Sequence, residues 1–248
     1  MAELLRPPPF DITSDRRYRL TPREKPTFQS VVPVEQLITQ DPDRSSVVRM
    51  RSDGGGVVVM DFEYPLHAGV IIDKLTLEER DGGGLATAAL QRRVESDAGV
   101  EVRREDVDFT DRTIPLPEAT YPEVALPFLL SFQPLDGKTR DLFAWINDRF
   151  LARVDFRTTG QVRLELPDTA EAVPAIKGIM YPDFNDWVRL PRLVTKLTEL
   201  FVPKYHMWFA AEPPHEVLRF EGPYGPPGAP EITMTLLPEQ EQGPGRSS

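Results

Sequence analysis

The chain has 248 residues, of which 40% are hydrophobic and 27% charged, with a formal net charge of −10, 26 prolines and no cysteine. This length suits one large all-β domain or two small ones. The acidic balance excludes a phosphate-tracking, nucleic-acid-binding surface as the main feature. The absence of cysteine excludes disulfides, thiolate metal sites and cysteine nucleophiles. The density of proline predicts many short elements joined by stiff turns.

The two ends of the chain differ in composition from its middle. Residues 1–30 are polar and punctuated by proline, which predicts an N-terminal arm with at most one short strand around Tyr18–Leu20. Residues 238–248 are rich in Gly, Pro, Glu and Gln, which predicts a flexible tail. Residues 31–237 are then expected to form a single domain. The N-terminus lacks a basic start followed by an apolar run, so we expect that it is not a secretory signal. No apolar stretch approaches the roughly 18–20 residues that span a bilayer. We expect a cytoplasmic protein without a transmembrane segment.

The middle of the chain shows a hydrophobic period of two, which is typical of strands. The first run of predicted strands is Val57–Tyr64, Val70–Arg80, Leu85–Glu95 and Val100–Phe109. A triple-glycine turn at 54–56 precedes the first strand, and turns at 82–84 and 97–99, which contain glycine, permit tight reversals before the third and fourth. The segment 85–93 has helical propensity, but the turns on both sides leave little room for a helical crossover. The last three of these strands, with two short turns between them, therefore predict an antiparallel meander.

Proline at 115, 117, 122 and 127 interrupts regular structure, so residues 114–127 are expected to cross one end of the sheet. Further strands are predicted at Asp141–Ile146, Leu151–Phe156, Gln161–Leu166, Ile176–Met180, Lys204–Ala210, Val217–Glu221 and Ile232–Leu237. Asn147–Asp148 and Glu212–His215 are predicted as hairpin turns.

One amphipathic helix is predicted at 190–201, because apolar residues recur there at helical spacing. Its apolar stripe consists of Leu190, Leu193, Val194, Leu197, Leu200 and Phe201. The strand that follows is apolar on both faces, with Tyr205, Met207 and Phe209 on one side and Trp208 and Ala210 on the other. Such a strand requires cover on both sides. The fold class is therefore mainly β: a curved antiparallel sheet or half-open β-barrel with this one principal helix packed on it.

The common catalytic signatures are missing from the sequence: it has no Gly-x-Ser-x-Gly, no phosphate-binding glycine loop and no His-Glu-x-x-His. His67, His206 and His215 are better explained as packed or turn residues than as metal ligands. The acidic pairs Asp106/Asp108 and Asp183/Asp186 are better explained as a solvated strand face and as helix caps. We predict no catalytic residue, no metal and no cofactor.

Two groups of residues are candidates for contact with a ligand or partner. The apolar group is Trp187, Leu190, Val194, Leu197, Phe201, Met207, Trp208 and Phe209. The basic group, which flanks the predicted helix, is Arg189, Arg192, Lys196 and Lys204. A basic amphipathic helix on an acidic protein could contact an anionic membrane or a partner, or cover an apolar cavity, whereas the simplest arrangement packs it on its own sheet.

Several segments carry a resemblance: Asp186–Arg192, Tyr205–His215, Arg219–Pro230, Pro117–Pro122 and Leu126–Leu130. They resemble uncharacterised bacterial β-sheet proteins that share a domain of unknown function and are often exported. The resemblance implies a strongly curved antiparallel sheet, similar to the half-barrel of lipoprotein carriers that hold acyl chains, and it brings no catalytic residues.

Three classes of function remain open from the sequence. The first is a non-enzymatic binding or scaffold protein whose concave apolar face accepts an apolar small molecule or a partner segment. The second is an accessory subunit of a larger assembly, with peripheral membrane contact as one form of it. The third is a cofactor-free barrel enzyme, such as an isomerase or cyclase, which would leave no motif.

Overall fold

The computed structural model describes residues 3–9, 11–24, 26, 37–39, 41, 43–52, 55–167, 169, 171–182, 204–223 and 229–238. Within them, 13 strands form one sheet in the order β6-β5-β4-β3-β2-β1-β13-β12-β11-β10-β9-β8-β7. The strands of its first half are β1 (Ile12–Pro22), β2 (Ser46–Ser52), β3 (Val57–Leu66), β4 (Gly69–Arg80), β5 (Gly84–Ser96) and β6 (Glu101–Asp108). Those of its second half are β7 (Thr120–Pro122), β8 (Arg140–Asn147), β9 (Phe150–Leu164), β10 (Val173–Pro182), β11 (Tyr205–Ala210), β12 (Val217–Pro223) and β13 (Glu231–Leu236).

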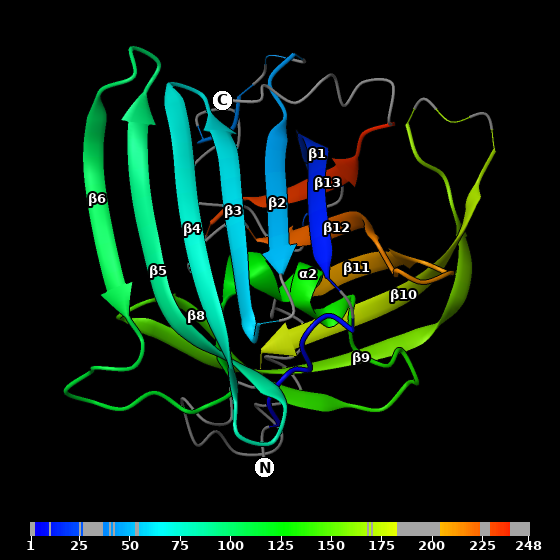
Figure 1. Cartoon of the computed structure of the whole chain (residues 1–248). Helices are drawn as coiled ribbons and strands as arrows, with labels where there is room; N and C mark the ends of the chain where they lie inside the picture. Colours follow the sequence, from blue (N-terminus) through cyan, green and yellow to red (C-terminus); the bar gives the residue numbers. More distant parts are fainter. Residues whose placement is uncertain are drawn as a thin grey trace, which may run out of the picture.

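The sheet is antiparallel except where β7 pairs with β8 in parallel, and it is curved and unclosed. Its two halves meet where β1 pairs with β13. Figure 1 shows β1–β6 running upright and β8–β13 running across behind them, so that the two halves face each other. The mainly β fold with a bent, half-open sheet is thus confirmed.

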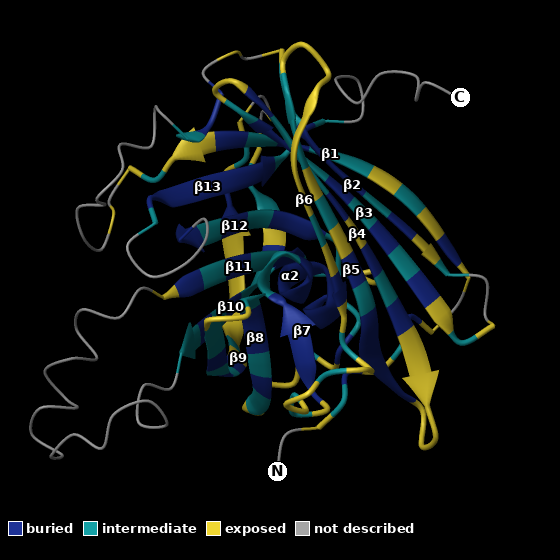
Figure 2. Ribbon diagram, turned by 90° about the vertical axis from the view of Figure 1, so that its left-hand side faces the viewer, coloured by how far each residue is buried: buried dark blue, intermediate teal, exposed yellow. Residues whose placement is uncertain are grey.

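A short helical segment lies in the space between the two halves (Figures 1 and 2). It consists of the 3-10 turn η1 (Glu123–Ala125) and the helix α2 (Leu126–Leu130), all five of whose residues are buried. The Phe128 ring packs against Tyr18 of β1 at 5.7 Å between ring centroids and against Phe62 of β3 at 5.8 Å. Apolar side chains from both halves therefore form one core around this segment.

The predicted meander is confirmed as β4, β5 and β6, joined by short turns, and the predicted strand before it is β3, which pairs with β4. Segment 85–93 is a strand despite its helical propensity, because residues 85–88 are buried in the sheet and paired with β4. The turns at 147–148 and 212–215 are confirmed as the hairpins β8–β9 and β11–β12. The predicted alternation of β11 is also confirmed, since Tyr205, Met207 and Phe209 are buried and the residues between them are not.

The prediction for the N-terminal region is wrong in one respect. Residues 12–22 form an 11-residue strand at the junction of the two halves, instead of at most a short strand around Tyr18–Leu20. The apolar signal is weak because Asp15, Arg16 and Arg17 occupy its middle. Two of these charges are paired across strands, Asp15 with Arg49 and Arg16 with Glu216. β2 was not predicted at all, although β1 and β3 pair with it on its two sides.

Two further predictions need correction, and one lies outside the described residues. The strands predicted at 151–156 and 161–166 are one continuous strand, β9, which passes through Gly160 at a φ of 125°. Residues 114–127 are not merely a crossing, because they contain β7, η1 and the start of α2. The amphipathic helix predicted at 190–201 falls in the undescribed residues 183–203, as do Asp183 and Asp186.

Tyr121 of β7 ties the N-terminal segment to β5. Its hydroxyl accepts a hydrogen bond from the Leu5 amide at 2.9 Å and donates one to the Leu85 carbonyl at 2.7 Å. Tyr121→Phe leaves both backbone groups buried without this partner, so we expect the free energy of unfolding to fall by about 2–3 kcal/mol in urea denaturation. Tyr18→Phe is the matched control, because Tyr18 is also a buried tyrosine but its hydroxyl has no hydrogen-bond partner among the described residues. Equal losses in the two variants would contradict the prediction.

Candidate functional site

The strongest candidate site is a cavity of about 360 Å³ between the two halves of the sheet. Its wall comes from β3–β6 on one side and from η1, α2, β8, β12 and β13 on the other. The lining residues are Leu37, Tyr64, Ile71, Asp73, Arg92, Val94, Arg103, Glu105, Glu123, Val124, Pro127, Trp145, Ile146, Asn147, Phe220, Pro223, Ile232 and Met234. A volume of this size lies within the range of small-molecule pockets, roughly 300–1,000 Å³.

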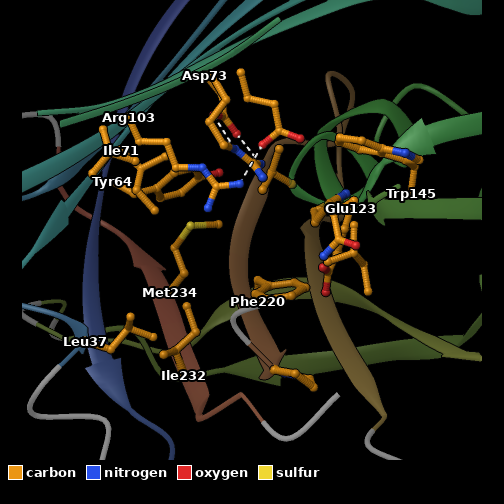
Figure 3. Close-up of a pocket in the computed structure, with 18 residues that line it drawn as sticks. Leu37, Tyr64, Ile71, Asp73, Arg103, Glu123, Trp145, Phe220, Ile232 and Met234 are labelled. Atoms are coloured by element: carbon orange, nitrogen blue, oxygen red, sulfur yellow. Dashed lines mark hydrogen bonds and ion pairs between the residues drawn. The ribbon is translucent and has the colours of Figure 1, made fainter. Parts of the chain in front are cut away.

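The cavity is amphipathic along its length. Figure 3 shows Leu37 and Ile232 at one end and Asp73 with Arg103 at the other, with Met234 between them. Aliphatic and aromatic side chains make up most of the wall, while the charged side chains come mainly from β4, β5 and β6. Such a surface suits an elongated ligand with an apolar body and one polar group.

A buried ion pair closes the polar end. Asp73 and Arg92 lie opposite each other on β4 and β5. The Arg92 guanidinium donates two hydrogen bonds to the Asp73 carboxylate, with N–O distances of 2.8 and 2.7 Å. The Asp73 side chain is fully buried, and that of Arg92 is 23% exposed. This bidentate geometry satisfies both oxygens of a carboxylate that stands on the inward, otherwise apolar face of β4.

Glu123, the first residue of η1, places a second carboxyl group at the wall. The Tyr205 hydroxyl donates a hydrogen bond to Oε1 of Glu123 at 2.6 Å, and Oε2 has no hydrogen-bond or ion-pair partner among the described residues. Burial raises the pKa of Glu123 to about 7, against the opposing effects of the Tyr205 hydrogen bond and the Arg92 charge. This group therefore changes charge near neutral pH.

Gly222 of β12 makes room for the Tyr205 ring. A Cβ at this position would lie 2.5 Å from Cδ1 of Tyr205, closer than any side chain tolerates. The Tyr205 ring also packs against Phe220 at 5.9 Å between centroids. Burial, followed by the Glu123 charge, raises the pKa of Tyr205 well above its usual value, so its hydroxyl stays a donor to Glu123.

Trp145 of β8 lies beside Glu123 in the wall (Figure 3). Its side chain is 2% exposed, and its ring meets Phe109 edge-on at 5.2 Å between centroids. The indole Nε1 is buried without a hydrogen-bond partner in the described part of the chain. Buried polar atoms of this kind are uncommon in folded proteins.

A smaller cavity of about 230 Å³ has another part of the helical segment in its wall. Phe128, Ser131 and Phe132 line it together with residues of β1, β2 and the β11–β12 turn. His215 is among these residues, and its Nδ1 is 2.9 Å from the Ala210 carbonyl oxygen. Because Arg16 and Glu216, which line this cavity, pair with each other, the cavity of about 360 Å³ is the better candidate.

The candidate contact residues predicted from the sequence lie in different parts of the structure. Met207 and Phe209 are fully buried in the core and do not line the large cavity. Trp208 lies on the opposite face of β11, with Lys177 at 5.2 Å and Arg219 at 5.5 Å from its ring centroid. Lys204 is exposed next to β11. The other candidates lie outside the described residues: Trp187, Arg189, Leu190, Arg192, Val194, Lys196, Leu197 and Phe201.

Sequence reasoning missed Glu123, Asp73 and Arg92, although two signals for them exist. Glu123 is the only charged residue in 119–135, a long apolar and proline-rich segment. Asp73 occupies an inward position of β4, in register with Ile71 and Leu75. A lone carboxylate in an apolar segment or on an apolar face is costly to bury without a partner, and therefore marks a site.

The comparisons with known proteins give no family for this chain: no family model matches it, and no curated protein does either. The resemblance to curved bacterial sheet proteins therefore stays a prediction. Within the described residues, no group of three or more His, Asp or Glu side chains is placed to hold a metal ion. Nor does any helix found there have the length and apolar character needed to cross a membrane.

Proposed function

We propose that this protein is a non-enzymatic binding protein that holds an apolar small molecule between the two halves of its curved sheet. The observation that carries the proposal is the cavity of about 360 Å³, whose wall is mostly apolar and whose polar groups gather mainly at one end. Ligand sites in proteins have this combination of an apolar wall and a few polar groups that set orientation.

The exposed apolar residues favour a ligand over a docking partner. In the described part of the chain, the large hydrophobic side chains that are exposed are Val57, Val100, Val102, Ile114 and Val162. All are aliphatic, and only Val100 and Val102 lie close together in sequence. Interfaces with partners usually present a contiguous patch with aromatic anchors. The concave interior, in contrast, brings Tyr64, Trp145 and Phe220 to one cavity.

Filling the cavity tests the proposal. Ile71 of β4 lines the cavity, whereas its neighbour Ile72 belongs to the other face of the same strand. We expect Ile71→Trp to weaken binding of the neutral fluorescent probe N-phenyl-1-naphthylamine at least about tenfold, because the indole occupies the space of the ligand. Fluorescence titration gives the dissociation constants.

Ile72→Trp is the matched control, since it adds the same side chain to the same strand outside the cavity. Its dissociation constant should equal that of the unmodified protein. If the unmodified protein does not bind the probe, or if both variants bind it as well as the unmodified protein does, the proposal fails.

A further inference from the structure

The charges that line the large cavity do not cancel. Asp73 is neutralised by Arg92, with a shortest distance of 2.7 Å, and Glu105 by Arg103 at 3.3 Å. The fifth charged lining residue is Glu123, which forms no ion pair with any described residue. When Glu123 is ionised, the cavity therefore carries one uncompensated negative charge in a mostly apolar wall, which is an unfavourable state without a ligand.

Glu123 offers an acceptor to a ligand. Oε1 accepts the hydrogen bond from Tyr205, while Oε2 has no hydrogen-bond partner in the described part of the chain. An anionic ligand at this position would meet a second negative charge. A cation would instead restore neutrality and form a charge-assisted hydrogen bond in a site of low dielectric.

The aromatic residues of the wall favour the same class of ligand. Tyr64, Trp145 and Phe220 line the cavity together with Glu123. Aromatic faces attract ammonium groups, and this attraction is strongest where the cation has lost its water. A carboxylate combined with several aromatic rings is thus suited to an alkylammonium head, and the aliphatic end of the cavity to its chain.

We propose that the ligand is a cationic amphiphile, with its ammonium group beside Glu123 and its apolar chain extending toward Leu37 and Ile232. This inference rests on the proposed function, because it names the ligand class of the same cavity. The net charge of −10 would add a long-range attraction for a cation that approaches the protein.

Binding of a cation should depend on pH through Glu123. Its pKa of about 7 means that the carboxyl group is mostly protonated at pH 6 and mostly ionised at pH 8. The groups that act on it are the Tyr205 hydroxyl of β11 and the Arg92 guanidinium of β5; Asp73, Arg103 and Glu105 face the same cavity as two ion pairs. We therefore expect the affinity for a cation to rise as the pH increases through 7. The affinity for a neutral amphiphile should stay the same over this range.

Three probes with the same chain distinguish the ligand classes: decylammonium, decanol and decyl sulfate, each titrated below the concentration at which it forms micelles. Displacement of N-phenyl-1-naphthylamine at pH 8 gives their relative affinities. We expect the ammonium probe to bind about tenfold more tightly than decanol, since a charge-assisted interaction is worth at least that factor. Decyl sulfate should be the weakest of the three.

Glu123→Gln removes the charge but keeps an oxygen that can accept from Tyr205. It should weaken the ammonium probe about tenfold and leave decanol unchanged. Glu165→Gln is the control, because Glu165 is exposed just after β9 and does not line the cavity. If Glu123→Gln fails to fold, the rise in ammonium affinity of the unmodified protein between pH 6 and pH 8 gives the same test.

The outcomes separate the two proposals. If N-phenyl-1-naphthylamine does not bind, the binding function itself fails. If the probe binds but decanol or decyl sulfate displaces it as well as decylammonium does at pH 8, binding stands and the assignment of a cationic ligand is overturned. The same assignment is overturned if Glu123→Gln, correctly folded, keeps the full affinity for decylammonium.

Discussion

Replacement of Arg92 by alanine is expected to lower the free energy of unfolding by about 3–5 kcal/mol, because it leaves a buried carboxylate without its partner. Asp73 has a fully buried side chain and receives two hydrogen bonds from the Arg92 guanidinium. Without the guanidinium, the unfavourable free energy of burying the Asp73 carboxylate is no longer offset. Urea denaturation followed by circular dichroism measures the change.

Two further variants sharpen this test. Arg104→Ala removes an arginine from the neighbouring strand β6, where its pair with Asp106 is exposed, and should leave the urea midpoint unchanged. The double variant Asp73→Leu/Arg92→Met removes both charges, so it should be more stable than Arg92→Ala alone. A midpoint for Arg92→Ala equal to that of Arg104→Ala would show that the pair is not buried as described.

Phe209→Ala is the second variant with a large expected effect, again about 3–5 kcal/mol of lost stability. The Phe209 side chain is fully buried, and its ring meets Phe156 edge-on at 6.1 Å between centroids. Gly178 of β10 lies under both rings, since a Cβ there would be 2.7 Å from Phe156 and 3.1 Å from Phe209. Truncation of Phe209 therefore leaves a cavity in the core that the neighbouring side chains cannot readily fill.

This variant also distinguishes a core residue from a ligand contact. Val102 of β6 is 63% exposed. Val102→Ala should therefore change the free energy of unfolding by no more than about 0.5 kcal/mol. Because Phe209 does not line the cavity, Phe209→Ala should keep its affinity for N-phenyl-1-naphthylamine at temperatures where it is folded. Loss of probe binding without loss of stability would place Phe209 in the site instead.

The sequence predicts the fold best where alternation is uninterrupted. In β3 and β4 the inward positions are mostly apolar, and turns that contain glycine follow β4 and β5, so these strands and their order could be inferred. In β1 the charged residue Arg16 shares a face with Tyr18 and Leu20, and its partner Glu216 is 200 residues away in the sequence. Local sequence cannot show this partner, and the strand therefore looked like an arm.

The candidate site was harder to predict because its parts are far apart in the sequence. Asp73 and Arg92 are joined by strand pairing, while Glu123 and Tyr205, which share a hydrogen bond, are 82 residues apart in the sequence. Sequence motifs consist of residues close together in the chain, and the polar residues of this cavity form no such motif. What the sequence did indicate correctly was the half-open shape on which such a cavity depends.

The proposed function requires that a ligand enters the cavity between the two halves of the sheet. The chain has 3 tryptophans. Two of them lie on opposite faces of the sheet, because Trp145 lines the cavity and Trp208 lies on the other face. In ¹⁵N-labelled protein titrated with N-phenyl-1-naphthylamine, with indole signals assigned by Trp145→Phe and Trp208→Phe, the Trp145 signal should shift while that of Trp208 stays in place. A shift of the Trp208 signal with no change at Trp145 would contradict the account.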